Sequence, residues 1–432
     1  MGFLDKKFSF GLCLLVFCVG ALSKFDVTLI ARVPLGEVLA FGAIPMLLNK
    51  GRFGKISNRL APVFWVLLIW TVGIILSDVF NEFYFLRFIR AFMKPLFCAF
   101  WMLFFIGVIL RDFRALIFYP LGLVLANVQN YLAPRAFSAE YIQAGGYEAV
   151  AYGVTPVVTS LCLAFAVLMY RKGRLWGVVA FLANATVLLA IGAPRSAAAL
   201  MILNAGIIFY IWWTRSTGRR SFHLTKGRLF TLGALGVIGG LSIYYAYIYA
   251  AGAGLLGEAQ YAKLVVQQNT IFGSSPLGLV LGGRTYVFAA ILAIIDQPLL
   301  GYGSWTGWTM SDYYFEAVSM VGTNAADLQR LADSGGGGMA GHSVLFQGWL
   351  ENGILCAIAI CVIAYWIVRE FLLMIQRDNR ITPWVVVLTT SFAWSFLFSP
   401  FGVGTRMAIG LFLAFHVIRF HEQTTEEPRR RV

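Results

Sequence analysis

The stretch LAPVFWVLLIWTVGIILSDV, residues 60–79, decides the fold class of this chain. An apolar run of roughly 17 to 25 residues is long enough to cross the hydrocarbon core of a bilayer as an α-helix, because a helix satisfies its backbone groups internally. The stretch therefore predicts a membrane-spanning helix.

Similar apolar runs extend over the whole chain, and no polar block between them is long enough to fold separately. We expect one all-α transmembrane domain, residues 1–432, built as a polytopic bundle of about 12 helices. A basic start and the lack of a small-residue cleavage site predict that the first apolar run is a retained helix. The expected spans are 8–22, 33–48, 60–79, 95–110, 115–127, 150–170, 175–191, 197–213, 229–250, 344–368, 382–398 and 407–418.

Composition limits the function. Hydrophobic residues make up 59% of the chain and charged residues only 12%, which cannot supply the surface of a water-soluble protein. The formal net charge of +14 comes from short basic clusters between apolar runs, so it does not indicate nucleic-acid binding. All six cysteines lie in apolar segments, which argues against a disulfide framework or a thiolate metal site.

The basic clusters predict the orientation in the membrane. With the N-terminus in the cytoplasm, the loops on that side carry about two thirds of the 34 lysines and arginines, as the positive-inside rule requires. Both termini are then cytoplasmic, and residues 251–343 form one large outer loop. This loop contains short helical patterns at 258–268 and 285–295 and four glycines at 335–338, and we expect it to hold the site.

Outer-face arginines are the first candidates for chemistry, because a charge next to hydrocarbon is costly unless it is paired or reaches the interface. Arg284 follows two glycines and opens a helical pattern, whose N-terminal end favours anions. Arg195 lies in the tight turn 192–196 between two expected spans. The structural alternatives are an interfacial anchor for Arg284 and a side chain that reaches lipid phosphate for Arg195.

A second basic group lies on an expected aromatic helix. Arg87, Arg90 and Lys94 recur at helical spacing among phenylalanines and a tyrosine. They could guide an anionic lipid, but general attraction to lipid head groups is the simpler interpretation.

His342 stands where the glycine-rich loop enters the expected span 344–368. A histidine there can exchange a proton near neutral pH, although a capping or packing role explains the same position. Glu351 lies more than two turns into that span, so we expect it to be protonated, paired with an arginine or turned toward a cavity. It is the chief buried charge that the sequence predicts within a span.

Three stretches, taken together, are similar to a known family. The first is Ala193-Pro194-Arg195-Ser196, and the second is Gly283-Arg284 with Phe288 and the segment Gln297-Pro298-Leu299-Leu300-Gly301-Tyr302-Gly303. The third is Gly341-His342-Ser343-Val344-Leu345 with Glu351-Asn352-Gly353. In sequence and in order they resemble the O-antigen ligase and O-antigen polymerase superfamily of polytopic membrane glycosyltransferases. The chain departs from that family at Phe288, where tryptophan is usual, and in the polar insert 309–339.

The resemblance implies transfer of a glycan from an undecaprenyl diphosphate carrier to a sugar hydroxyl on the periplasmic face of a bacterial inner membrane, with no metal or other cofactor. Arg284 and Arg195 would hold the diphosphate and stabilise the charge that develops on it. His342 would accept the proton of the attacking hydroxyl, giving inversion at the anomeric carbon. Arg87 and Arg90 would guide the carrier, and the supporting residues would be Glu351 and Tyr302.

Three functions stay open on these grounds. A polymerase, which we favour, would use a second carrier-linked repeat as acceptor, whereas a ligase would use lipid A-core of lipopolysaccharide. A flippase for lipid-linked oligosaccharide would need charged residues deep in several spans and broken helices. Expected partners are the lipid-linked donor, a glycan or lipid-linked acceptor, membrane lipids and other polysaccharide-assembly proteins such as a chain-length regulator, with no nucleic acid.

The role implied for Arg284 can be tested by substitution. Arg284→Lys is expected to lose nearly as much glycan-extending activity as Arg284→Ala, because a lysine point charge cannot replace the two-pronged contact of a guanidinium with a diphosphate. Activity is compared in cells that contain equal amounts of each variant. Full activity of the lysine variant would contradict the role.

Overall fold

In the computed structural model, the described residues are 9–28, 32–48, 57–134, 149–170, 172–191, 195–216, 241–242, 244–255, 261, 264–265, 268, 275, 285–305, 311–321, 343–377, 379–399 and 401–419. They form an all-α helical bundle, which confirms the predicted fold class. The α-helices are α1 (Phe10–Ala21), α2 (Leu35–Leu47), α4 (Ser57–Phe80), α5 (Phe85–Asp112), α6 (Phe118–Leu132), α9 (Thr155–Met169), α10 (Arg174–Ala190), α11 (Arg195–Ser216), α15 (Thr285–Asp296), α16 (Ser311–Val321), α18 (Val344–Arg377), α19 (Thr382–Phe398) and α20 (Val403–Ile418).

Three short elements interrupt this pattern. A 3-10 turn, η1 (Phe113–Ile117), joins α5 to α6, and a π-helical turn, η2 (Val150–Val154), precedes α9. Strands β1 (Asp26–Thr28) and β2 (Arg32–Pro34) pair as a small antiparallel hairpin, with Val27 opposite Val33. This hairpin is not predicted from the sequence, because a strand of three residues is too short to show the alternation of apolar and polar side chains.

The membrane character of the chain is evident from helix length and composition. Within the described residues, five helical stretches are long and apolar enough to cross a bilayer, and each overlaps expected spans. Six shorter apolar helices, α15 among them, accompany these stretches. Expected span 229–250 lies largely outside the described residues. The five stretches are Asn58–Phe80, Phe85–Leu132, Val150–Met169, Ser196–Ser216 and Val344–Gln376.

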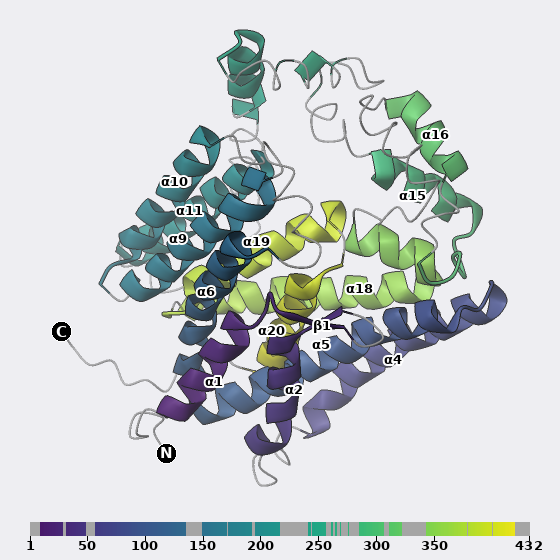
Figure 1. Ribbon diagram of the computed structural model, residues 1–432, viewed down its shortest axis with the longest axis horizontal. Helices are drawn as coiled ribbons and strands as arrows, with labels where there is room; N and C mark the ends of the chain where they lie inside the picture. Colours follow the sequence, from purple (N-terminus) through teal and green to yellow (C-terminus); the bar gives the residue numbers. More distant parts are fainter. Residues whose placement is uncertain are drawn as a thin grey trace.

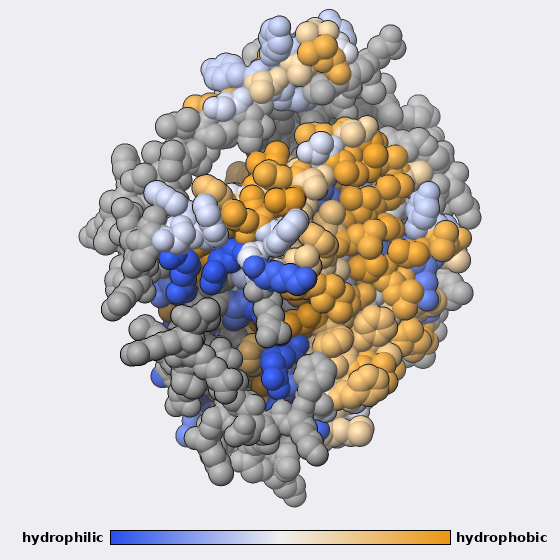
Figure 2. Space-filling model, turned by 90° about the vertical axis from the view of Figure 1, so that its left-hand side faces the viewer, coloured by the Kyte–Doolittle hydropathy of each residue, from blue (hydrophilic) through white to orange (hydrophobic). Residues whose placement is uncertain are grey.

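One side of the bundle presents a broad hydrophobic surface (Figure 2). Helices α9, α10 and α11 lie side by side there, and α10 packs against both of the others (Figure 1). Large apolar side chains on these helices remain exposed, including Phe165, Trp176 and Leu203. An exposed apolar surface of this kind suits lipid as its solvent.

Helix α5 is central to the core. It packs against α2, α4 and α20, and it buries Trp101, Phe104 and Phe105 completely or almost completely. A Cβ atom added at Gly410 of α20 would collide with Trp101, so a glycine is needed for the close approach of these two helices. Small residues let helix backbones approach closely in the same way in other membrane bundles.

Helix α18 is broken at Gly353, and this break positions the candidate site. Gly353 has φ 70° and ψ −170°, a conformation outside the helical region. In an unbroken helix the Leu350 carbonyl would accept from the Ile354 amide. Instead, Leu350 O accepts from Tyr302 N at 2.9 Å, and Ile354 N donates to Leu299 O at 3.0 Å. The loop 297–305 thus fills the break and satisfies the backbone groups that it frees.

Substitution of Gly353 tests this fit. Gly353→Ala is expected to lower the melting temperature of the purified protein, because alanine is strained at this φ and its Cβ would collide with the Leu299 carbonyl. The cost should be about 1–3 kcal/mol. The matched control is Gly206→Ala in α11, where nothing lies near the added Cβ and stability should be unchanged or raised. Equal melting temperatures for Gly353→Ala and the wild type would refute the fit.

Candidate functional site

The structure describes only some of the predicted site residues. His342 and Arg284 lie outside the described residues, and so does the side chain of Arg195, whose backbone begins α11. Their predicted meeting in one pocket stays a prediction. Ser343, which follows His342, caps α18: its Oγ accepts from Phe346 N at 3.1 Å and donates to Phe396 O at 2.7 Å.

The predicted basic stripe on α5 divides into two parts. The Arg87 guanidinium lies 4.5 Å from the centroid of the Tyr84 ring, and Arg90 is exposed. Lys94, one turn after Arg90, is instead drawn into the protein, where its side chain is only 11% exposed. The first two residues keep a surface position that suits an anionic lipid, whereas Lys94 belongs to a buried polar cluster.

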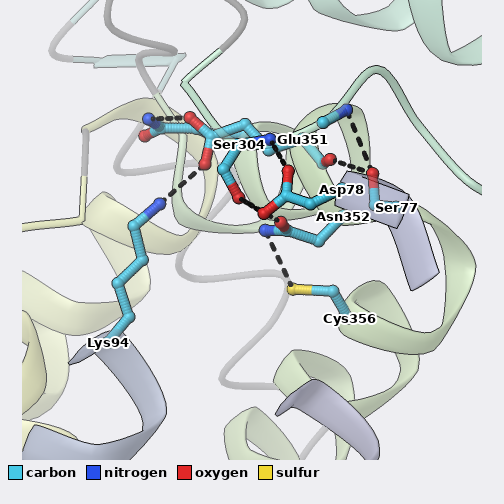
Figure 3. A network of polar contacts seen from close by, with 9 residues as sticks. Ser77, Asp78, Lys94, Ser304, Glu351, Asn352 and Cys356 are labelled. Carbon is cyan, nitrogen blue, oxygen red and sulfur yellow. Dashed lines mark hydrogen bonds and ion pairs between the residues drawn. The ribbon is translucent and has the colours of Figure 1, made fainter. Parts of the chain in front are cut away.

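Lys94 and Glu351 form the centre of this cluster. Lys94 Nζ lies 2.7 Å from Glu351 Oε2 (Figure 3). Gln347 Nε2 donates to Glu351 Oε1 at 2.8 Å. From the sequence, Glu351 is expected to be protonated, paired with an arginine or turned toward a cavity, and the observed lysine partner corrects that expectation. The reason is tertiary: α4 packs against both α18 and α5, which brings together two residues 257 positions apart.

Asp78 is the second carboxylate of the cluster, and it holds the end of the loop 297–305. Ser304 N donates to Asp78 Oδ1 at 2.6 Å and Ser304 Oγ donates to Asp78 Oδ2 at 2.7 Å, with Asn352 Oδ1 at 3.4 Å from the same hydroxyl (Figure 3). Asp78 is not among the site residues predicted from the sequence. Its isolation as the one charge in the run 60–79 was the available signal.

Neutral side chains at the end of α4 and just after it also form hydrogen bonds with the loop 297–305 and with the broken turn of α18. Ser77 Oγ donates to the Glu351 carbonyl at 2.6 Å and accepts from Gly303 N at 3.0 Å. Asn81 Nδ2 donates to the Gly301 carbonyl at 3.2 Å. The end of α4, the loop 297–305 and the first half of α18 therefore form one hydrogen-bonded unit.

Tyr302 supports the loop from its other face. Its hydroxyl lies 3.1 Å from the Ala293 carbonyl and 2.9 Å from the hydroxyl of Tyr313 on α16. Tyr313 in turn donates to Asp296 Oδ2 at 2.5 Å, and this bond to a carboxylate raises the pKa of the Tyr313 phenol. Tyr302 thus ties α15 and α16 to the loop, which is a positioning role.

Further buried ion pairs correct the expectation that Glu351 is the chief buried charge. Glu37 on α2 is paired with Arg406 on α20 through two hydrogen bonds of 2.6 and 2.5 Å, and Trp101 Nε1 donates to it at 2.9 Å. Glu370 on α18 lies 3.1 Å from His416 on α20. Glu370 lies just beyond the expected span 344–368, whereas Glu37 lies within the expected span 33–48, and only the packing of α2 and α18 near α20 shows their partners.

The cluster around Lys94 has a definite chemical character. Two carboxylates, Asp78 and Glu351, lie with a single ammonium, and hydroxyl and amide groups surround them. Such a set suits ligands rich in hydroxyl groups, which donate to carboxylates and accept from ammonium. It suits a diphosphate poorly, because like charges repel.

Comparison of the sequence with models of known families and with curated proteins finds no match.

The buried pair of Lys94 and Glu351 can be tested by a double-mutant cycle. Lys94→Met is expected to destabilise the protein by about 3–5 kcal/mol, because it leaves Glu351 buried and unpaired beside Asp78. Adding Glu351→Gln should recover much of that loss, since the amide needs no counter-charge. Melting temperatures of the purified proteins give the result, with Arg90→Met as a surface control that should change little. Strictly additive effects would show that the two side chains do not interact.

Proposed function

We propose that this protein is a metal-independent, inverting glycosyltransferase of a bacterial inner membrane. It transfers a glycan from an undecaprenyl diphosphate-linked donor to a sugar hydroxyl on the periplasmic face, and we favour polymerisation of O-antigen or exopolysaccharide over ligation to lipid A-core. The proposal includes about 12 transmembrane helices with both termini in the cytoplasm and the large loop 251–343 outside.

One observation carries the proposal. Two of the segments that resemble the O-antigen ligase and polymerase superfamily, 297–303 and 351–353, are distant in sequence but lie side by side in the structure. The hydrogen bonds of Tyr302 N with Leu350 O and of Ile354 N with Leu299 O join them at the break in α18. The polar cluster of Asp78, Lys94 and Glu351 lies against this junction, because Asp78 holds Ser304 of the loop and Glu351 directly precedes the break.

The contacts at the two ends of the bundle support the proposed sidedness. Arg111 donates to the Leu47 carbonyl at 3.2 Å, and Arg215 donates to the Gln376 carbonyl, so ends that the charge pattern predicts to be cytoplasmic do meet. The cluster of Asp78, Lys94 and Glu351 joins ends that the same pattern predicts to be periplasmic.

The proposed reaction uses the residues in the following way. The acceptor hydroxyl attacks the anomeric carbon from the side opposite the diphosphate, and His342 takes its proton as the new glycosidic bond forms. The bond from the anomeric carbon to the diphosphate oxygen breaks, and Arg284 and Arg195 stabilise the charge on the leaving undecaprenyl diphosphate. The donor is already activated by its diphosphate, so the transfer requires no further energy source.

A flippase for the same lipid-linked glycan is the second candidate. Transporters commonly use broken helices and buried ionisable groups. The break at Gly353 and the buried pairs of Glu37 with Arg406 and of Glu351 with Lys94 favour this candidate more than the sequence alone did. Against the flippase, both pairs lie close to helix ends that the charge pattern predicts to be periplasmic, whereas a transporter needs charged residues deep in its spans.

His342→Ala separates the two candidates. If the protein is the transferase, the variant should lose glycan extension by several orders of magnitude, and single carrier-linked repeats should accumulate on the periplasmic side. The sidedness is measured by labelling the sugars of intact cells and of lysed cells. Accumulation on the cytoplasmic side would instead support a flippase. His223→Ala, in a loop predicted to be cytoplasmic, is the matched control and should extend glycan normally.

A further inference from the structure

Trp305, at the end of the loop 297–305, has a backbone conformation that is rare for a bulky residue. Its φ is 61°, in the left-handed region that favours glycine. The preceding residue, Ser304, is fixed there by two hydrogen bonds to Asp78. Strain of this kind persists only where the surrounding structure enforces it, and such positions cluster at binding sites.

The enforced conformation places the indole beside the charged cluster. The Lys94 ammonium lies 5.5 Å from the centroid of the Trp305 ring. Trp305 is nevertheless 42% exposed, whereas its neighbour Ser304 is only 4% exposed. An apolar aromatic surface is therefore open to a ligand directly next to buried polar groups.

Among the described residues, the polar groups of the cluster leave hydrogen-bonding capacity for a ligand. Each carboxylate oxygen of Asp78 and Glu351 has one hydrogen bond from that part of the chain, although each can accept two. The Lys94 ammonium has three hydrogens, of which the bond to Glu351 uses one. A pyranose ring matches this arrangement, because its C–H face is apolar and its rim carries hydroxyl groups that donate and accept.

We propose that Trp305 stacks on a pyranose ring of the glycan and that Lys94 binds a hydroxyl of the same sugar. The inference rests on the proposed function and deepens it, because it separates a sugar subsite from the arginines that hold the diphosphate. An interfacial tryptophan that only anchors the protein in the membrane would not need the strained backbone that Asp78 and Ser304 enforce here.

Direct binding to the full-length protein in lipid nanodiscs tests the subsite without any turnover. The probe is a set of oligosaccharides obtained by partial hydrolysis of the surface polysaccharide of the producing cells. Trp305→Ala should weaken their binding about tenfold, and Trp305→Phe should weaken it less, since a ring is kept. Trp305→Gly should weaken binding as much as Trp305→Ala while its melting temperature stays the same or rises, because glycine relieves the strain.

Two controls make the result specific. Trp65→Ala removes an exposed tryptophan of α4 and should leave saccharide binding unchanged. Inorganic pyrophosphate should bind the wild type and Trp305→Ala equally, because the arginines bind it. Unchanged saccharide binding in Trp305→Ala, full binding in Trp305→Gly or no binding by the wild type would each overturn the subsite.

The same measurements keep this inference distinct from the proposed function. If Trp305→Ala loses saccharide binding while His342→Ala still extends glycan, the sugar subsite stands and the transferase mechanism falls. If His342→Ala is inactive while Trp305→Ala binds saccharide like the wild type, the transferase stands and the subsite falls.

Discussion

The hydrogen bonds between the loop 297–305 and the broken turn of α18 are the constraint on which the rest of the site depends. Without water, a free carbonyl at Leu350 or a free amide at Ile354 would each cost several kcal/mol by general estimates, so the break exists only because the loop fills it. The loop in turn has no regular structure of its own. The loop therefore supplies hydrogen-bond partners for the broken turn, and the broken turn holds the loop in place. Together these contacts fix the positions of Ser304 and Trp305.

The contact between the loop 297–305 and α18 also brings the buried carboxylates Asp78 and Glu351 together. Ser77 and Asp78 at the end of α4 bind the loop, and Glu351 lies just before the break, so two carboxylates come together in a largely apolar bundle. Lys94 compensates one of them through a direct ion pair. Ser304 donates one hydrogen bond to each oxygen of the other. A charge that is both paired and hydrogen-bonded can be kept inside a membrane protein, whereas an isolated one cannot.

The chemistry of the described cluster complements the chemistry expected of the arginines. A lipid-linked glycan has an anionic diphosphate and a neutral, hydroxyl-rich sugar, and no single environment suits both. Carboxylates beside an exposed indole favour the sugar, while guanidinium groups favour the diphosphate. A site with two such halves would hold the donor in one orientation and expose the anomeric carbon between them.

The sequence by itself determined the all-α membrane class and the positions of most helices. The reason is that the length of an apolar run, which is visible in the sequence, decides whether a helix can cross the hydrocarbon core. The sequence also singled out the segments 297–303 and 351–353 by their resemblance to a known family, and it marked Glu351 as a charge that needs a partner. Only the tertiary structure decided that the partner is Lys94, that Asp78 holds Ser304 and that Trp305 lies over the ammonium. These contacts join residues on different helices, and their pairing depends on how the helices pack, which no local pattern encodes.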